Sequence, residues 1–306
     1  MYPDLYSLIH DVIGIEMPYL MYVKTFGYFL SLAIISTFIL FYLDVKRNER
    51  VGIIKIVLLN RKNFMPSEKL PFVVLITIIS ALLGGKFFDI LENFQKITWD
   101  NYFTIIAKSG YAYYGGLILG FVGGWLTCLR LNLPFSRLLD SLSPYLMLGY
   151  AVGRMGCHLS GDGDWGIPNP MAVPNWWFLP HFLWAYDYPN NAIESGFLIE
   201  NCSGKYCYHL DPSVFPTSLY EPIIALIFSF VLYYLKPKFI EVSGIIFCFF
   251  LLFMGIERFF IEFIRINPLH KMSNILLSQA QYISILIVLI SIFIMAYFLL
   301  KQKMKV

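Results

Sequence analysis

The 306-residue sequence is poor in charged residues. Asp, Glu, Lys and Arg together make up 14% of the chain, whereas a soluble globular protein has about 25%. Hydrophobic residues make up 58% and aromatic residues 18%. The net charge of +3 is too small for a surface that neutralises nucleic-acid phosphates, so no nucleic-acid partner is expected. These figures argue against a soluble enzyme and favour a protein of the lipid bilayer.

Long apolar segments predict seven membrane-spanning helices, because one helical crossing needs about 20 apolar residues. Three segments contain no charged residue, namely 25–43, 111–129 and 282–300. Three more are shorter or contain charges, namely 71–90, 219–235 and 244–256. Segment 138–153 is more polar, but without it the flanking loops would fall on the wrong sides of the membrane. The sequence therefore predicts an all-α polytopic integral membrane protein, with residues 1–306 forming one membrane domain.

The distribution of Lys and Arg predicts the orientation. With seven spans, one set of loops and termini holds fourteen Lys and Arg residues and the other holds eight. Cytoplasmic loops carry the excess of positive residues, so the N-terminus is expected on the periplasmic side and the C-terminus in the cytoplasm. The first 24 residues lack a basic start and do not resemble a cleaved signal peptide. We expect a multi-pass protein of a bacterial inner membrane.

The longest connection, at about residues 154–218, is predicted to be a periplasmic insertion. It is rich in Trp and Phe, which favour an ordered segment packed at the level of the lipid headgroups. Cys202 and Cys207 lie in this connection, where a periplasm would be oxidising, so a short local disulfide is plausible. Cys128 and Cys248 lie in predicted spans and are interpreted as small apolar residues.

A glycine-rich segment follows the fourth predicted span. Residues 153–166 contain five glycines, together with Arg154, Asp162 and Asp164. Such a backbone can approach a ligand closely or bind an anion with its amide groups. The alternative is a surface turn with solvated Asp residues, but a turn alone has no need of an Arg at the end of a membrane span.

Two further clusters place charge at the ends of spans. Arg258, Glu262 and Arg265 would lie within roughly 60° of one another on one face of a continuing helix. An i,i+4 ion pair explains part of this pattern, but not the second Arg. Glu221 is expected one turn inside the fifth span, where a carboxylate is costly without a partner.

Tyr114, Gly115 and Gly116 lie at the outer end of the third predicted span. Gly116, Gly120 and Gly124 form a stripe of small residues, which close helix packing alone would explain. Tyr114 could also be an anchor at the membrane interface. No metal site is expected from Cys157, His158, Asp162 and Asp164, because their spacing matches neither a tetrahedral zinc pattern nor a calcium loop.

These motifs together resemble the bacterial prolipoprotein diacylglyceryl transferases. The resemblance extends over nearly the whole chain and is carried by Gly84-Gly85-Lys86, Tyr114-Gly115-Gly116-Leu117, segments 153–166, 216–221 and 258–265, and Ser278-Gln279-Ala280-Gln281. It implies a seven-helix inner-membrane enzyme that transfers the diacylglyceryl group of phosphatidylglycerol to the lipobox cysteine of a preprolipoprotein. Glycerol phosphate is released and no cofactor is needed. Membrane lipids and the signal peptide of the preprolipoprotein are the implied partners.

The resemblance also implies roles for individual residues. Arg154 looks like the family's phosphatidylglycerol-binding arginine, and Arg258 like its second essential arginine. Asp162 stands near the family's acidic residue, Gly166 matches its closing glycine and Glu262 its helical glutamate.

The sequence departs from the family pattern in three places. Tyr114 stands where the family usually has a His proposed as the base, Cys157 replaces an Asn, and residues 25–27 replace a Trp-Tyr-Gly motif. Tyr114, Glu262 and His158 are possible bases.

These inferences define the predicted site. The catalytic set is Arg258, Glu262, Tyr114 and Asp162, and the substrate-binding set is Arg154, Gly166, Arg265, Gly115, Gly116 and Glu221. Two alternatives stay open. One is a transporter or binding protein for an anionic solute, although no internal repeat is visible and the charged clusters lie at the outer boundary rather than the midplane. The other is an inactive relative that binds lipid or lipoprotein.

Overall fold

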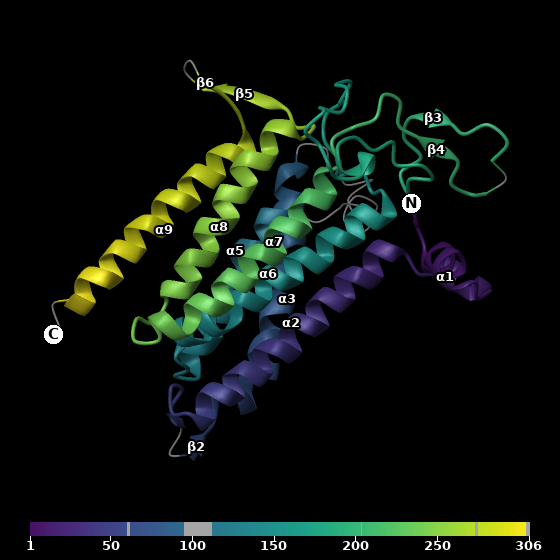
Figure 1. Ribbon diagram of the computed structural model, residues 1–306. Coiled ribbons are helices and arrows are strands. Elements are labelled where there is room, and N and C mark those ends of the chain that lie inside the picture. The colour runs from purple at the N-terminus through teal and green to yellow at the C-terminus, as the bar shows by residue number, and fades with distance from the viewer. Residues whose placement is uncertain (60–61, 95–111, 203, 273–274, 304–306) are drawn as a thin grey trace. The chain divides into compact units, whose positions relative to one another are not determined.

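The computed structural model describes residues 1–59, 62–94, 112–202, 204–272 and 275–303, and these residues are mostly helical (Figure 1). The chain divides into two compact units, one formed by Met1–Phe41 and Leu139–Val306 and the other by Tyr42–Leu138. The prediction that the whole chain forms one membrane domain stays a prediction.

Within the described part of the chain, seven long helices correspond to the predicted spans, and residue 111 of the third span lies outside the described residues. These helices are α2 (Thr25–Arg50), α3 (Pro66–Glu92), α5 (Tyr113–Arg130), α6 (Phe135–Ser160), α7 (Thr217–Leu235), α8 (Ile245–Ile261) and α9 (Gln279–Lys303). Among the described residues, four helical stretches are long and apolar enough to cross a membrane: Thr25–Arg50, Pro66–Glu92, Thr217–Phe239 and Gln279–Gln302. That α5, α6 and α8 also cross the bilayer stays a prediction.

Shorter elements lie between the long helices and were not predicted from the sequence. Helix α1 (Leu5–Ile13) precedes α2, and its first turn is capped by the side chain of Asp4, which accepts a hydrogen bond from the Ser7 amide at 3.0 Å. Within the described ranges there are three antiparallel strand pairs: β1 (Val57–Leu59) with β2 (Lys62–Phe64), β3 (Phe197–Leu198) with β4 (Tyr208–His209), and β5 (Leu269–Met272) with β6 (Ile275–Ser278). The expectation of an exclusively helical chain therefore holds for the long segments only.

The second unit contains the glycine stripe. Helices α3 and α5 pack closely, and a Cβ atom at Gly116 would lie 3.2 Å from the Ala81 carbonyl oxygen. A Cβ at Gly120 would lie 3.0 Å from the Ala81 Cβ, and one at Gly124 would lie 2.7 Å from the Thr77 hydroxyl oxygen. The stripe is therefore the contact surface between two helices, as its spacing predicted.

In the first unit, α6, α7 and α8 share a hydrophobic core, which contains Met147, Ala151, Ala225, Leu232, Ile245 and Ile246. Asp140 of α6 is buried beside the start of α8. Its carboxylate accepts hydrogen bonds from the Gly244 amide at 2.5 Å and the Phe247 amide at 3.1 Å. A carboxylate at the beginning of a helix accepts hydrogen bonds from the free amides and interacts favourably with the positive end of the helix dipole. This contact accounts for an Asp inside the most polar of the predicted spans.

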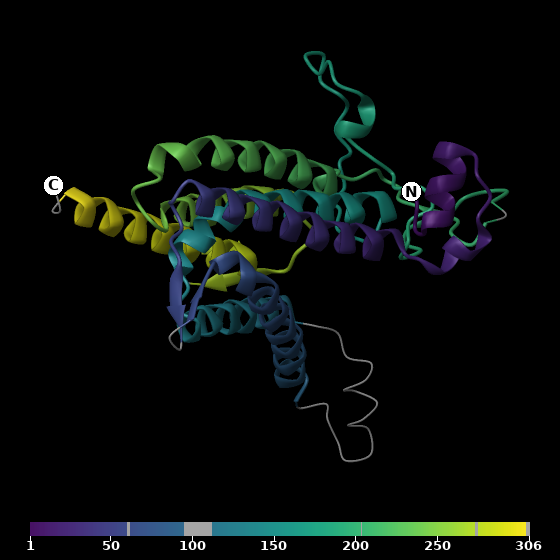
Figure 2. The ribbon, with the colours of Figure 1, turned by 90° about the horizontal axis from the view of Figure 1, so that it is seen from below.

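The described residues of the long connection between α6 and α7 pack around aromatic side chains, in line with its aromatic content. Trp165, Tyr188, Leu210 and Val214 form a small buried core. The stretch around η3 (His181–Leu183) extends away from the ends of α6 and α7 (Figure 2), and Trp176 and Phe178 in that region are exposed. Its placement at the lipid headgroups stays a prediction.

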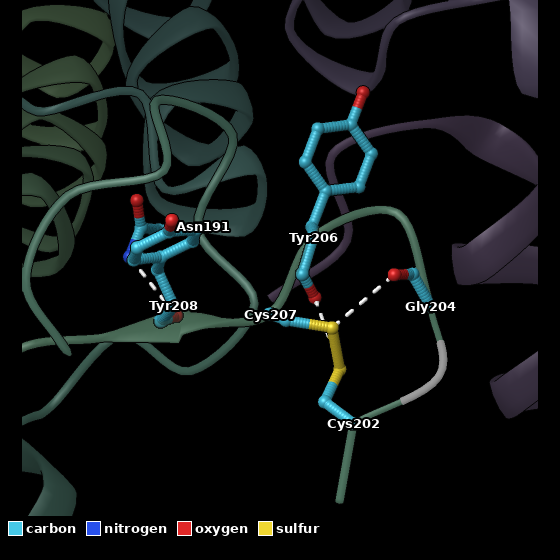
Figure 3. The surroundings of a disulfide bond; sticks show 6 residues. All are labelled: Asn191, Cys202, Gly204, Tyr206, Cys207 and Tyr208. Carbon is cyan, nitrogen blue, oxygen red and sulfur yellow. Dashed lines mark hydrogen bonds between the residues drawn. A yellow bond between two sulfur atoms is a disulfide. The ribbon is translucent and has the colours of Figure 1, made fainter. Parts of the chain in front are cut away.

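The predicted disulfide between Cys202 and Cys207 is present, in the turn that joins β3 to β4 (Figure 3). Cys128 and Cys248 are buried free thiols, in agreement with their interpretation as small apolar residues.

Candidate active site

Four segments of the first unit bring charged side chains together. Arg154 lies in the last two turns of α6, and Glu221 lies in the first two turns of α7. Arg258 lies in the last turn of α8. Arg265 follows the short 3₁₀ helix η5 (Glu262–Ile264) that extends α8. We call Arg154, Glu221, Arg258 and Arg265, together with Asp164 and Glu262, the arginine cluster.

Glu221 is the centre of the arginine cluster. Its side chain is 0% exposed, and its Oε2 atom forms an ion pair with Nη2 of Arg154. Its Oε1 atom lies 3.1 Å from Nη1 of Arg265 and 3.4 Å from Nη1 of Arg258. The expectation that a Glu inside this span needs a partner is therefore confirmed, and the partner is a group of three guanidinium ions.

Asp164 also connects two of these arginines. Its Oδ2 atom pairs with Nη1 of Arg154, and its Oδ1 atom lies 2.7 Å from Nη2 of Arg265. Burial alone would raise the pKa of Asp164, but the two guanidinium ions outweigh it and hold the pKa below its ordinary value. Asp164 thus stays ionised at neutral pH.

The sequence singled out Asp162 rather than Asp164 as the acidic residue of the site. Among the described residues Asp162 forms no ion pair, and its Oδ1 atom accepts a hydrogen bond from the Asp164 amide at 3.3 Å. Burial raises the pKa of Asp162 above its ordinary value. A catalytic role for Asp162 stays a prediction, whereas the contact with the arginines belongs to Asp164.

Glu262 orients Arg258. Its Oε2 atom lies 3.2 Å from Nη2 of Arg258 and 4.0 Å from Nε of Arg265, and its Oε1 atom accepts a hydrogen bond from Asn267 at 2.6 Å. The predicted charged face assumed that α8 continues through Arg265, and this was wrong. The helix ends at Ile261 and tightens into η5, and the backbone at Arg265 is extended. Pro268 excludes a regular helix beyond Asn267, but the backbone leaves the helix several residues earlier.

Gly166 joins the glycine-rich segment to two other parts of the site. Its amide donates to the Phe215 carbonyl at 2.8 Å, and the next amide, of Ile167, donates to the Ile264 carbonyl at 2.9 Å. A Cβ atom at Gly166 would lie 2.8 Å from the Phe215 Cβ and 2.9 Å from its carbonyl oxygen. The close approach of three backbone segments therefore requires glycine here. The predicted role in substrate binding remains untested.

A buried hydrogen-bond network lies beside the cluster. Nδ1 of His158 lies 3.2 Å from the Ser218 hydroxyl, which is 2.8 Å from the Tyr188 hydroxyl. All three side chains are buried. The sequence singled out His158 as a possible base. It placed Ser218 in the motif 216–221 without giving it a role, and it did not single out Tyr188.

Tyr114, Gly115 and Gly116 belong to the second unit. Tyr114 is exposed at the start of α5, and Gly115 packs against Phe88 of α3, whose side chain would lie 2.5 Å from an added Cβ. The contacts of both glycines are helix contacts, and the catalytic and substrate-binding roles predicted for the three residues stay predictions.

The side chains of Cys157, Asp162 and Asp164 place their possible ligand atoms within 4.8 Å of one another. A cation at this point would compete with Arg154 and Arg265 for Asp164, since both arginines already pair with that carboxylate. Arg154 also lies 3.8 Å from the Cys157 sulfur. The arrangement therefore favours an anion over a metal ion as the ligand.

Comparisons with known proteins agree with this chemistry. The sequence model of the family described as prolipoprotein diacylglyceryl transferase matches residues 14–297. A phosphatidylglycerol–prolipoprotein diacylglyceryl transferase of Clostridium tetani is 26% identical over 220 residues, covering 72% of this chain and 77% of the relative. The enzyme of the same name from Clostridium botulinum is 29% identical over 231 residues, covering 75% and 80%. That from Leptospira interrogans is 25% identical over 295 residues, covering 80% and 83%. The chain is therefore a multi-pass membrane protein that belongs to the prolipoprotein diacylglyceryl transferase family.

Proposed function

We propose that this chain transfers the diacylglyceryl group of phosphatidylglycerol to the thiol of a lipobox cysteine in a preprolipoprotein. A thioether is formed and glycerol phosphate is released. The observation that carries the proposal is the convergence of Arg154, Arg258 and Arg265 on one buried carboxylate in a chain of this family.

The exposures of the side chains indicate where a phosphate would bind. Among the three arginines, the side chain of Arg258 is 31% exposed, whereas those of Arg154 and Arg265 are 13% and 10% exposed. Among the carboxylates, Asp164 is 34% exposed, but Glu221 and Glu262 are almost completely buried. Asp164 is thus the carboxylate that an incoming phosphate can replace. Arg258 offers the most accessible guanidinium, and Arg154 becomes available when Asp164 is displaced.

The reaction requires charge to be neutralised on the leaving group. A thiolate attacks the glyceryl carbon, the bond between that carbon and the phosphate oxygen breaks, and the electron pair leaves with glycerol phosphate. Guanidinium groups hold two oxygens of a phosphate at once, and fixed charges in a water-poor site stabilise a transition state by several kcal/mol, on the order of 3. Arg154 and Arg258 are the proposed clamp, and Glu221, Glu262 and Arg265 hold them in place. Asp162 and Tyr114 are the further side chains proposed for catalysis.

The arginine cluster is proposed to lie on the periplasmic side of a bacterial inner membrane, with seven spans and the C-terminus in the cytoplasm. The excess of Lys and Arg in the opposite set of loops supports this orientation. The disulfide between Cys202 and Cys207, in the same connection as the site, indicates an oxidising compartment. Single cysteines introduced into this connection should react with a membrane-impermeant thiol reagent in intact cells, and those in the loop around residues 47–69 should not. The reverse pattern would overturn the topology.

A transferase assay tests the proposed function. The purified protein in phosphatidylglycerol vesicles should increase the mass of a lipobox peptide by one diacylglyceryl group, and it should release one glycerol phosphate per modified peptide. Vesicles of phosphatidylethanolamine and a peptide with Ser in place of Cys are the controls. A correctly inserted protein that leaves the cysteine peptide unmodified would refute the proposal and favour the inactive-relative or transporter alternative.

A further inference from the structure

Glu257 is a buried acid that the arginine cluster does not use. Its exposed fraction is 5%, and neither of its carboxylate oxygens has a hydrogen-bond partner among the described residues. A buried carboxylate without a partner is costly in the ionised form. The position therefore needs an explanation beyond packing.

Helical geometry places Glu257 on the side of α8 that faces the core. Glu257 follows Phe250 by seven residues, so the two lie within about 20° of one another around the helix axis, and Phe250 packs against the core shared by α6, α7 and α8. Gly255, roughly 200° away from Glu257, faces α9 instead, where an added Cβ would lie 3.2 Å from the Ser284 carbonyl oxygen. Glu257 therefore points towards α6 and α7.

The same core brings Glu257 to the level of the arginine cluster. Arg154 follows the core residue Ala151 by three positions, and Glu221 precedes the core residue Ala225 by four. Glu257 likewise lies about one turn beyond Phe253, which packs on that core. Glu257 interacts electrostatically with Arg258, Arg154 and Arg265, and with the carboxylate of Glu262.

The charges in the cluster are balanced without Glu257. Three arginines pair with the carboxylates of Glu221, Asp164 and Glu262. On α7 the acid is Glu221, which is already shared by the three arginines, so no uncompensated carboxylate from α7 faces Glu257. Burial disfavours the ionised form of Glu257, and the nearby arginines favour it.

We propose that Glu257 is the catalytic base that accepts the thiol proton of the acceptor cysteine. This inference rests on the proposed function. Glu262 and His158, the other candidates in this unit, already have partners: Glu262 binds Arg258 and Asn267, and His158 lies in the network with Ser218. Within the part of the chain that the structure describes, the carboxylate oxygens of Glu257 have no hydrogen-bond partner. Glu257 directly precedes Arg258 of the proposed clamp and interacts electrostatically with Arg154.

The proton is accounted for through the whole cycle. The proton of the thiol moves to the Glu257 carboxylate while the sulfur–carbon bond forms and the bond between the glyceryl carbon and the phosphate oxygen breaks. The electron pair of the broken bond leaves with glycerol phosphate, now a phosphate monoester dianion. Because the second pKa of a phosphate monoester is about 6, the departing dianion can accept the proton from Glu257 and release it to water after it leaves the site. The carboxylate is then ready for the next thiol.

Glu257→Gln is the test variant, because it keeps the size and polarity of the side chain but cannot accept a proton. With a cysteine peptide, turnover should fall by at least about 10²-fold, the lower end of what a general base supplies. The turnover of the wild type should fall at acid pH as the base becomes protonated, and the residual activity of Glu257→Gln should lack this fall. Glu200→Gln, which changes an exposed Glu in the long connection, is the matched control and should behave as the wild type.

A selenocysteine peptide separates a base from a structural residue. Its selenol is ionised at neutral pH without help, whereas a thiol with a pKa of about 8.5 is mostly protonated. The ratio of the selenocysteine rate to the cysteine rate should therefore rise by about 10² in Glu257→Gln. It should also rise in Glu257→Asp, and this second variant tests the role of Glu257 as a base if Glu257→Gln does not insert. An unchanged ratio in the variants that insert, or wild-type turnover in Glu257→Gln, overturns the proposal. A wild type that modifies neither peptide would instead refute the proposed function itself.

Discussion

Replacing Arg154 with Lys tests the phosphate clamp. Arg154 uses two different nitrogen atoms, one on Asp164 and one on Glu221, and its side chain is 13% exposed. Lys keeps the positive charge but has a single nitrogen and no planar fork. It cannot hold two oxygens in the arrangement that the guanidinium imposes. Glu221 would keep Arg258 and Arg265, so the buried carboxylate stays compensated in Arg154→Lys and insertion should be preserved.

The expected magnitude follows from the loss of one hydrogen bond to the departing phosphate. A single charge-assisted hydrogen bond made in the transition state, in a site shielded from water, contributes about 3 kcal/mol. Its loss slows turnover by roughly 10²-fold. If this bond forms mainly as the phosphate leaves, turnover falls even at saturating phosphatidylglycerol. If Arg154 only binds the lipid in its ground state, KM rises and turnover is unchanged.

Steady-state transfer to a lipobox peptide, measured over a range of phosphatidylglycerol contents in the vesicles, separates these outcomes. Lys205→Gln is the control, because Lys205 is an exposed cation in the connection between α6 and α7 and lies outside the arginine cluster. Arg258→Lys should behave as Arg154→Lys does. If both variants insert and keep near-normal turnover and KM, the arginines do not act on the phosphate and the reasoning is wrong.

Three further predictions concern the surroundings of the site. Replacing Cys202 and Cys207 with Ser should lower the stability of the connection by about 2 kcal/mol, as expected for closing a short loop, and should leave transfer activity unchanged; a melting curve and the assay check both points, and lost activity would give the disulfide a role in the site. Gly166→Ala should reduce activity and melting temperature together, since the added methyl group collides with Phe215; wild-type values for both would contradict the assigned packing. Because the pKa of Asp164 is depressed, its ion pairs stabilise the fold above the unfolded Asp value of about 3.9, and this contribution is lost as the pH falls through the lower folded value. The difference in melting temperature between the wild type and Asp164→Asn should therefore be constant from pH 7 to pH 5 and shrink below about pH 4; a difference that shrinks near neutrality would show that Asp164 is not held ionised.

The features that follow from composition and burial could be predicted from the sequence. Apolar segments long enough to cross a membrane became helices, because a backbone surrounded by lipid must bond to itself. Glu221 was expected to need a partner, since an isolated carboxylate in an apolar span is too costly. Cys202 and Cys207 are close in sequence, so their bond needed little information from the rest of the fold.

The features that depend on the packing of distant segments could not be predicted. Asp162 and Asp164 flank a single glycine, Gly163, whose backbone is left-handed with a φ angle of 99°, and only Asp164 pairs with the arginines among the described residues. The helical pattern through Arg265 gave no sign that α8 ends at Ile261. Glu257 likewise looked like one of several charges at the end of a span until the packing of α8 was known.

The pairing beside Gly166 joins the outgoing and returning ends of the long connection. Pro168 pairs with Val214, and the amide of Asn169 donates to the carbonyl of Ser213 at 2.8 Å. The chain between these points is therefore an excursion whose two ends are fixed beside the arginines. Tyr188 and Leu210 in this segment belong to the buried core, whereas the stretch near Phe178 is exposed, so only that exposed stretch is a suitable place for insertions. An epitope tag or a fluorescent reporter placed next to Phe178 would be displayed while the site stays assembled.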